Sequence, residues 1–182
     1  MTRSIPTCLA VLLLCASSPA IALEPAADFY LLTGQSNMSG RGLLTELTPA
    51  ERAPDPDIKL YGNDGRWRVA VDPLDDAAGQ VDGVSSDNQA AVGPGLFFAR
   101  QMHKARKRPV SVAPCAKGGS SIGRWKPGGG RETLYGSCLA RAKEAGLSVT
   151  GIVWYQGETD AEKPDSAKAW TDSFTQMATQ FR

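Results

Sequence analysis

The sequence contains little histidine and little cysteine. Its 182 residues include one histidine, His103, and four cysteines. Cys8 and Cys15 fall in an apolar stretch at the N-terminus, which leaves Cys115 and Cys138 for the remainder of the chain. These residues lack the short spacing of zinc ligands, so we predict no metal site. The second cysteine pair can form a disulfide in an oxidising compartment or remain two buried thiols, and the sequence leaves both possibilities open.

An excess of charge of either sign is also absent. The chain has 20 Lys and Arg against 19 Asp and Glu. That balance provides no electrostatic footprint for nucleic acid or for an anionic membrane, so we expect no nucleic-acid partner. The basic cluster from His103 to Arg108 stands where a helix is expected to end, which favours a solvated helix terminus.

The N-terminus has no apolar run long enough to span a membrane. The run from Ile5 to Ala16 is shorter than the about 20 residues that a spanning helix needs. Arg3 precedes this run, and Ala20-Ile21-Ala22 has the small-x-small pattern of a signal-peptidase site. We therefore predict a signal peptide at residues 1–22 and a secreted or periplasmic protein without membrane contact after its removal. One mature domain is expected over residues 23–182, which is long enough for a sizeable core.

Strand-like and helix-like segments alternate along this domain, which is typical of an α/β fold. Short apolar runs predict buried strands at residues 28–33, 109–114 and 149–155, with small strands possible at 58–61 and 67–71. Helices are predicted at residues 95–106, around residues 134–142, and from Asp165 onward. The last of these carries an apolar stripe of Trp170, Phe174, Met177 and Phe181, which is typical of a core face.

The unusual residues follow the three predicted buried strands, and parallel sheets place their chemistry beyond the carboxyl ends of their strands. The first strand leads to GQSNMSG with Ser36, the second to CAKGGSSIGRW with Gly118 and Gly119, and the third to WYQGETD with Gln156. A serine at a sharp turn, a glycine N–H and a side-chain amide can supply a nucleophile and the donors of an oxyanion hole. A helix cap, a flexible turn and a structural amide are the respective structural alternatives.

These blocks resemble a known family. GQSNM, GGSSI and WYQGE(T)D are similar to the blocks of the sialate O-acetylesterase and acetylxylan-esterase branch of the SGNH hydrolases, from about Phe29 to Asp160. The resemblance implies a three-layer α/β/α sandwich with a parallel, flavodoxin-like sheet, no cofactor, and an acetylated carbohydrate as substrate. It assigns Ser36 as the nucleophile with its own N–H in the oxyanion hole. Gly119 (or neighbouring Gly118) would be the glycine donor, and Gln156 the third donor.

The chain departs from the family pattern at the catalytic base. The family carries a D-x-x-H histidine near its C-terminus, which this chain lacks, so His103, Glu158 and Asp160 are the remaining candidates. A carboxylate with a pKa of about 4 is a weaker base than an imidazole with a pKa of about 6.5. We expect a domain that is incomplete at its C-terminus, a fragment in preference to an inactive product, with residues 151–155 at an unpaired sheet edge. The alternative function is a secreted carbohydrate-binding relic without catalysis.

Overall fold

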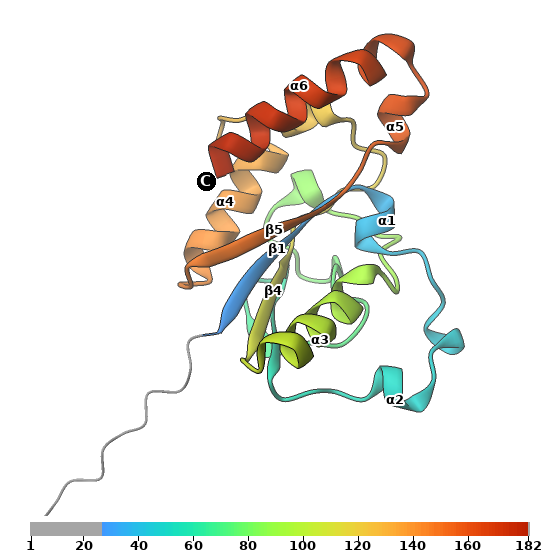
Figure 1. The fold of residues 1–182 in the computed structure, drawn as a ribbon, viewed down its shortest axis with the longest axis vertical. Helices are drawn as coiled ribbons and strands as arrows, with labels where there is room; N and C mark the ends of the chain where they lie inside the picture. Colours follow the sequence, from blue (N-terminus) through green and yellow to red (C-terminus); the bar gives the residue numbers. More distant parts are fainter. Residues whose placement is uncertain (1–26, 182) are drawn as a thin grey trace, which may run out of the picture.

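A computed structural model describes residues 27–181, so the predicted signal peptide at residues 1–22 lies outside the described residues. The chain forms a five-stranded sheet in the order β3-β2-β4-β1-β5. Figure 1 shows β4, β1 and β5 side by side in this sheet. Its strands are β1 Asp28–Gly34, β2 Ile58–Tyr61, β3 Trp67–Val69, β4 Val110–Pro114 and β5 Val149–Tyr155. Neighbouring strands are parallel except β2 and β3. The predicted α/β fold with a mostly parallel sheet is confirmed.

Helices occupy the segments between the strands. They are α1 Ser36–Ser39, α2 Pro49–Arg52, α3 Pro94–Arg106, α4 Leu134–Glu144, α5 Glu158–Ala161 and α6 Pro164–Phe181, with 3-10 turns at Leu44–Glu46, Gly83–Ser85 and Ile122–Trp125. The three predicted helices are therefore present. Asp165 lies in the first turn of α6 rather than at its cap, because the helix begins at Pro164, whose fixed φ suits a first helical position. Within residues 27–181 no helix is long and apolar enough to cross a membrane.

Helices cover both faces of the sheet, and β1 shows why. Side chains alternate between the faces of a strand, and every residue of β1 is buried. Phe29 and Leu31 pack with α4 and α6 in one hydrophobic cluster, whereas Tyr30 and Leu32 pack with α3 in the other. Figure 1 shows α4 and α6 on one side of the strands and α3 on the other. A strand buried on both faces reads as the continuous apolar run seen in the sequence.

The order β4-β1-β5 is the 2-1-3 order with which a flavodoxin-like sheet begins, and β2 and β3 extend it beyond β4. Among the described residues β5 pairs only with β1, so it forms an edge of the sheet, as predicted. Its end residues Val149 and Tyr155 are 41% and 49% exposed. The loops that follow β1, β4 and β5 therefore emerge next to one another at one end of the sheet.

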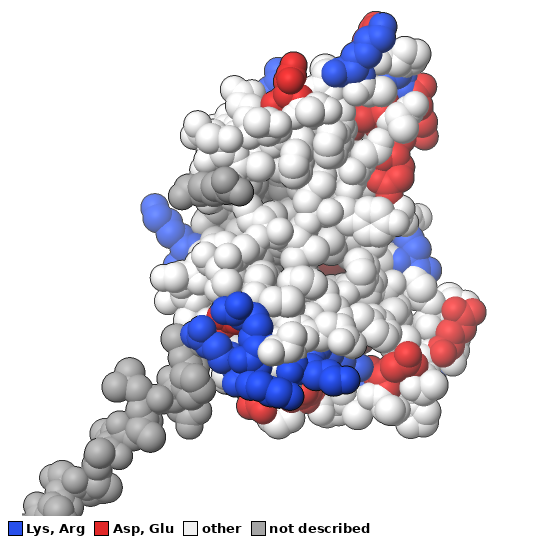
Figure 2. Space-filling model, in the orientation of Figure 1, with Lys and Arg blue, Asp and Glu red and all other residues white. Residues whose placement is uncertain are grey.

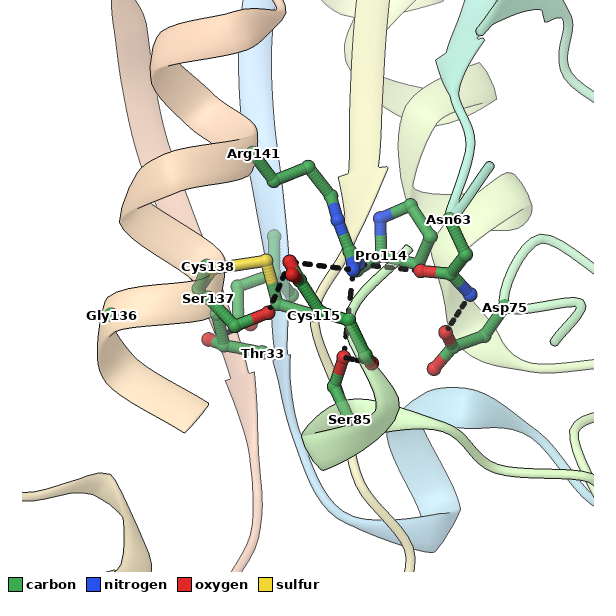
Figure 3. Close-up of a disulfide and its surroundings, with 12 residues drawn as sticks. Thr33, Asn63, Asp75, Ser85, Pro114, Cys115, Gly136, Ser137, Cys138 and Arg141 are labelled. Atoms are coloured by element: carbon green, nitrogen blue, oxygen red, sulfur yellow. Dashed lines mark hydrogen bonds and ion pairs between the residues drawn. A yellow bond between two sulfur atoms is a disulfide. The ribbon is translucent and has the colours of Figure 1, made fainter. Parts of the chain in front are cut away.

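A disulfide joins Cys115, the residue after β4, to Cys138 in α4 (Figure 3). This decides between the two alternatives that the sequence left open. Arg141, one turn further along α4, is buried and donates a hydrogen bond to the backbone oxygen of Pro114. Figure 3 shows both links between the end of β4 and α4. The disulfide and this hydrogen bond together hold the end of β4, where the glycine loop begins, against α4.

Candidate active site

The turn after β1 brings Ser36 to the carboxyl end of the central strand. Gly34 has a φ of +136°, and a Cβ there would lie 2.1 Å from the backbone oxygen of Tyr155, so the approach of β1 to β5 requires glycine. The N–H of Gln35 donates to the same oxygen at 2.9 Å. Gln35 occupies the cap position of α1, so the interpretation of Ser36 as a helix cap is wrong. Ser36 is the first residue of α1, where backbone N–H groups have no partner within the helix.

The glycine loop after β4 lies against this turn. The N–H of Lys117 donates to the backbone oxygen of Gly34 at 3.0 Å, which ties the two loops together. The N–H of Gly118 donates to Oδ2 of Asp87 at 2.9 Å and is therefore occupied. Gly119 has a φ of +67°, and its N–H makes no hydrogen bond among the described residues. Of the two glycines named from the sequence, Gly119 is the one with a free donor.

Ser36 and Gly119 line the same open cleft of about 530 Å³. The other lining residues are mostly polar or charged: Arg41, Ser86, Asp87, Asn88, Gln89, Lys117 and Gly118. The ammonium of Lys117 donates to the backbone oxygen of Ser86 at 2.6 Å. The cleft thus brings together two of the three predicted site residues and surrounds them with hydrogen-bonding groups from the segment between β3 and α3.

Asp87 lines the cleft and holds its loops together through hydrogen bonds. This buried carboxylate accepts hydrogen bonds from Arg41 at 2.8 Å, from Ser39 at 2.9 Å and from Gly118 at 2.9 Å. Burial by itself would raise the pKa of Asp87, but the hydrogen bonds from Arg41, Ser39 and the backbone of Gln89 outweigh it and hold the pKa below its ordinary value. Asp87 therefore stays ionised. Sequence reasoning missed it because it lies in the irregular segment, without a motif.

The side chain of Gln156 is buried beside the cleft and does not line it. Its amide nitrogen donates to the backbone oxygen of Ser120 at 3.0 Å and to the carboxylate of Asp160, while its oxygen accepts from the indole of Trp170 at 2.8 Å. Both amide hydrogens are thus engaged, as in the structural alternative. The oxyanion role of Gln156 stays a prediction, and it requires the amide to release one of these partners.

Two of the candidate bases are carboxylates in α5. Asp160 is 2% exposed and accepts from the N–H of Ile122 at 2.8 Å as well as from Gln156, so it joins the third loop to the second. Glu158 is half-buried and accepts a hydrogen bond from the amide of Asn37, the residue after Ser36. Of the two, Glu158 is the one that contacts the serine turn.

His103 lies at the opposite end of the sheet. Its Nδ1 is 2.8 Å from the backbone oxygen of Arg108, two residues before β4 begins, and its Nε2 is 3.8 Å from Asp57, directly before β2. Because β1, β2 and β4 are parallel, these contacts place His103 at their amino ends, whereas Ser36 follows a carboxyl end. In this fold His103 cannot serve as the base for Ser36.

A mostly parallel sheet with a serine turn and a glycine loop at the carboxyl ends of its strands has the architecture of an α/β esterase. The family model described as carbohydrate esterase, sialic acid-specific acetylesterase, matches residues 26–182, and the chain belongs to this family. The resemblance to the carbohydrate acetylesterases, drawn from three short blocks, is thereby confirmed.

Relatives and solved structures agree with this assignment. The chain is 29% identical over 175 residues to the probable carbohydrate esterase At4g34215 of Arabidopsis thaliana, an alignment that covers 87% of this chain and 64% of that protein. The chain therefore spans less than two thirds of that relative. The X-ray structure of the Arabidopsis protein matches with a TM-score of 0.74 at 27% identity, covering 87% of this chain and 68% of that one.

Two further structures share the fold at lower identity. The Xanthomonas citri protein XAC1771, titled a novel carbohydrate acetylesterase, matches with a TM-score of 0.59 at 24% identity over 85% of this chain and 38% of its own. NanS matches with a TM-score of 0.62 at 22% identity over 88% of this chain and 62% of its own.

Proposed function

We propose that this chain carries the nucleophile and oxyanion hole of a secreted serine esterase that removes acetyl groups from carbohydrates. The observation that carries the proposal is the placement of Ser36 and the free N–H of Gly119 on one polar cleft. Family membership supports acetyl ester hydrolysis. The Cys115–Cys138 disulfide supports export, since disulfides persist in oxidising compartments.

The proposed chemistry is acyl transfer to water. The hydroxyl oxygen of Ser36 attacks the acetyl carbonyl, and the N–H groups of Ser36 and Gly119 donate to the oxyanion that develops. Collapse of the tetrahedral intermediate breaks the bond to the sugar oxygen, which takes up the proton that the base removed from Ser36 and leaves as a hydroxyl. The acetyl group stays as an ester on Ser36. Water then attacks this ester and gives a proton to the base, which passes it to the serine oxygen as acetate is released. The polar lining of the cleft suits the hydroxyl groups of a sugar.

The proton of Ser36 requires a base. In the leading form of the proposal this is a histidine outside these 182 residues, which is consistent with the greater length of the Arabidopsis relative. Within the chain, Glu158 is the candidate that contacts the serine turn. Loss of the base of a catalytic triad costs about a million-fold in rate, so the identity of this group decides how active the 182 residues are.

The second candidate function is binding of acetylated carbohydrate without turnover. It is favoured by one observation: the single histidine of the sequence lies at the far end of the sheet from Ser36. In this case the cleft would recognise the ester and release no acetate.

Acetate release from p-nitrophenyl acetate and from acetylated xylan distinguishes the two. The wild-type chain is compared with Ser36→Ala and with Ser148→Ala, a matched exposed serine just before β5. Activity that disappears in Ser36→Ala and persists in Ser148→Ala supports the esterase, and Glu158→Gln then tests the base. Binding of acetylated xylan by folded protein without acetate release, even with imidazole added as an external base, supports the second candidate, whereas release that imidazole restores supports an esterase whose base lies outside these residues. Equal hydrolysis by wild type and Ser36→Ala would overturn Ser36 as the nucleophile.

A further inference from the structure

Three side chains with metal-binding atoms meet at the end of the sheet remote from the cleft. Asp55 and Asp57 lie in the turn that leads into β2, and His103 lies in the last turn of α3. One carboxylate oxygen of each aspartate and one ring nitrogen of the histidine all lie within 4.8 Å of one another. In Figure 2 acidic side chains border the cluster of Lys and Arg over this end of the molecule.

The orientation of the imidazole is fixed by its other nitrogen. Nδ1 lies 2.8 Å from the backbone oxygen of Arg108, and because a carbonyl can only accept, Nδ1 carries the proton. Nε2 of the neutral ring then presents a lone pair. Metal-binding histidines are commonly oriented in this way, with one ring N–H held by a carbonyl and the other nitrogen free to coordinate.

The lone pair of Nε2 faces a carboxylate. Oδ2 of Asp57 is 3.8 Å away, which is too far for a hydrogen bond. Two electron-rich atoms facing each other repel unless a positive charge lies between them, and that charge can be a proton on Nε2 or a bound cation. Zinc bonds of 2.0–2.2 Å at tetrahedral angles place ligand atoms about 3.4 Å apart. The 3.8 Å between Nε2 of His103 and Oδ2 of Asp57 is close to this value, and the three ligand atoms lie within 4.8 Å of one another.

The carboxylates are held by the backbone of their own turn. Oδ1 of Asp55 accepts the N–H of Asp57 at 2.9 Å, and the backbone oxygen of Asp57 accepts the N–H of Val110 in β4 at 2.9 Å. The side chain of Asp57 is 59% exposed, so it can move the remaining few tenths of an ångström toward His103, whose side chain is 29% exposed. The site is thus preorganised on its backbone and open to water.

We propose that Asp55, Asp57 and His103 bind a divalent transition-metal ion, zinc first among them, that clamps the end of α3 to the turn before β2. One imidazole with two carboxylates suits zinc, whereas calcium takes six to eight oxygen ligands. Water completes the coordination. This site is separate from the esterase cleft, and its role is structural. The sequence prediction of no metal site relied on short ligand spacing, and these ligands come from segments far apart in the chain.

Neighbouring basic residues weaken the site. Arg106 and Arg108 lie beside it, although both form ion pairs with Asp28. Arg100 donates to the backbone oxygen of Ala53. With three protein ligands and this local positive charge, we expect weaker binding than in closed structural zinc sites with four ligands.

The single histidine makes a specific test possible. Untagged protein labelled with ¹⁵N-histidine gives the signals of one imidazole. Zinc that binds to thiols elsewhere in the chain does not shift these signals. Zinc chloride is titrated into this protein at pH 7.5, with calcium chloride in parallel. We expect a saturable shift of the ¹⁵Nε2 resonance with zinc, a higher melting temperature, and no such shift with calcium.

Variants assign the ligands. Asp57→Asn and Asp55→Asn should each weaken zinc binding by more than about tenfold, since even outer-shell partners of metal sites contribute 10- to 100-fold. Asp165→Asn, an exposed aspartate in α6, is the matched control and should bind as the wild type does. The proposal is overturned if zinc leaves the Nε2 resonance unmoved while acid shifts it, because the proton alone then occupies the gap. Equal zinc binding by Asp57→Asn would also overturn it.

Discussion

The carboxylate of Asp87 accepts the backbone N–H of Gly118 at 2.9 Å, across 31 residues of sequence. The same oxygen accepts the hydroxyl of Ser39 at the end of α1. One buried charge therefore joins the glycine loop to the helix that begins at Ser36. Because it occupies the N–H of Gly118, it leaves that of Gly119 as the free donor beside the cleft.

Asp87→Ala should therefore lower the kcat for acetyl ester hydrolysis by about tenfold to a hundredfold, with a smaller change in KM, because small misplacements of an oxyanion donor cost about that much. Asp64→Ala is the matched control, since Asp64 also pairs with an arginine, Arg68, at 2.8 Å but away from the cleft. Amide hydrogen exchange gives a readout that does not need turnover: the amide of Gly118 should exchange faster in Asp87→Ala. Unchanged exchange and kcat would contradict this role.

Gly34→Ala should destabilise the protein by more than about 3 kcal/mol, because a steric overlap adds to the 1–3 kcal/mol of an unfavourable backbone conformation. The added Cβ would lie 2.1 Å from the backbone oxygen of Tyr155. Gly83→Ala is the control, since a Cβ at Gly83 meets nothing within 4 Å. Urea denaturation followed by circular dichroism measures both variants. A loss in Gly34→Ala no larger than in Gly83→Ala would show that the approach of β1 to β5 does not depend on glycine.

Removing the disulfide should cost about 3 kcal/mol of unfolding free energy, the chain-entropy value for a closed loop of this length. Cys115 and Cys138 are 23 residues apart, and both are buried. The double variant Cys115→Ala/Cys138→Ala is compared with the wild type with and without dithiothreitol. The reductant should lower the melting temperature of the wild type and leave that of the double variant unchanged. If the wild type is treated with dithiothreitol in the unfolded state and its melting temperature does not change, this result would contradict the cross-link.

The sequence predicts those parts of this protein whose cause is local. The strand at residues 149–155 is recognised because an apolar run is bounded by turn residues. Ser36 and Gly119 are named as candidates because they lie in the loops after such runs, and their catalytic roles stay a prediction. Asp87 carries no comparable signal, since its partner Gly118 lies 31 residues away in another loop. Asp160 belongs to the third block, but its hydrogen bond with Ile122, 38 residues away, could not be read from that block. The engagement of Gln156 by Trp170 likewise depends on how α6 packs, which periodicity alone does not determine.

A second buried carboxylate near the site has the opposite electrostatics to Asp87. Asp75 is buried, and one of its oxygens accepts from the amide of Asn63 at 2.8 Å, while the other has no partner among the described residues. Burial raises the pKa of Asp75 to about 6, and the hydrogen bond from Asn63 and the charge of Arg141 oppose the shift without cancelling it. Asp75 therefore stays protonated to a higher pH in the folded protein than in the unfolded chain.

This shift has a defined sign in the stability of the protein. A carboxyl whose pKa is higher in the folded state than in the unfolded chain contributes stability below about pH 4, and this contribution is lost as the pH rises through 6. Relative to Asp75→Asn, which does not titrate, the wild type should lose up to about 3 kcal/mol of unfolding free energy between pH 4 and pH 7, since one pKa unit corresponds to about 1.4 kcal/mol.

Urea denaturation of both proteins at intervals from pH 4 to pH 7 measures this difference. Burial also raises the pKa of Asp72 to about 6, but that residue is present in both proteins, so its contribution cancels in the comparison. The ion-paired carboxylates, which lose stability toward low pH, cancel in the same way. A difference between wild type and Asp75→Asn that stays constant over this range would mean that Asp75 ionises in the folded protein as readily as in the unfolded chain. Arg141 would then compensate its charge fully, despite the unpartnered oxygen.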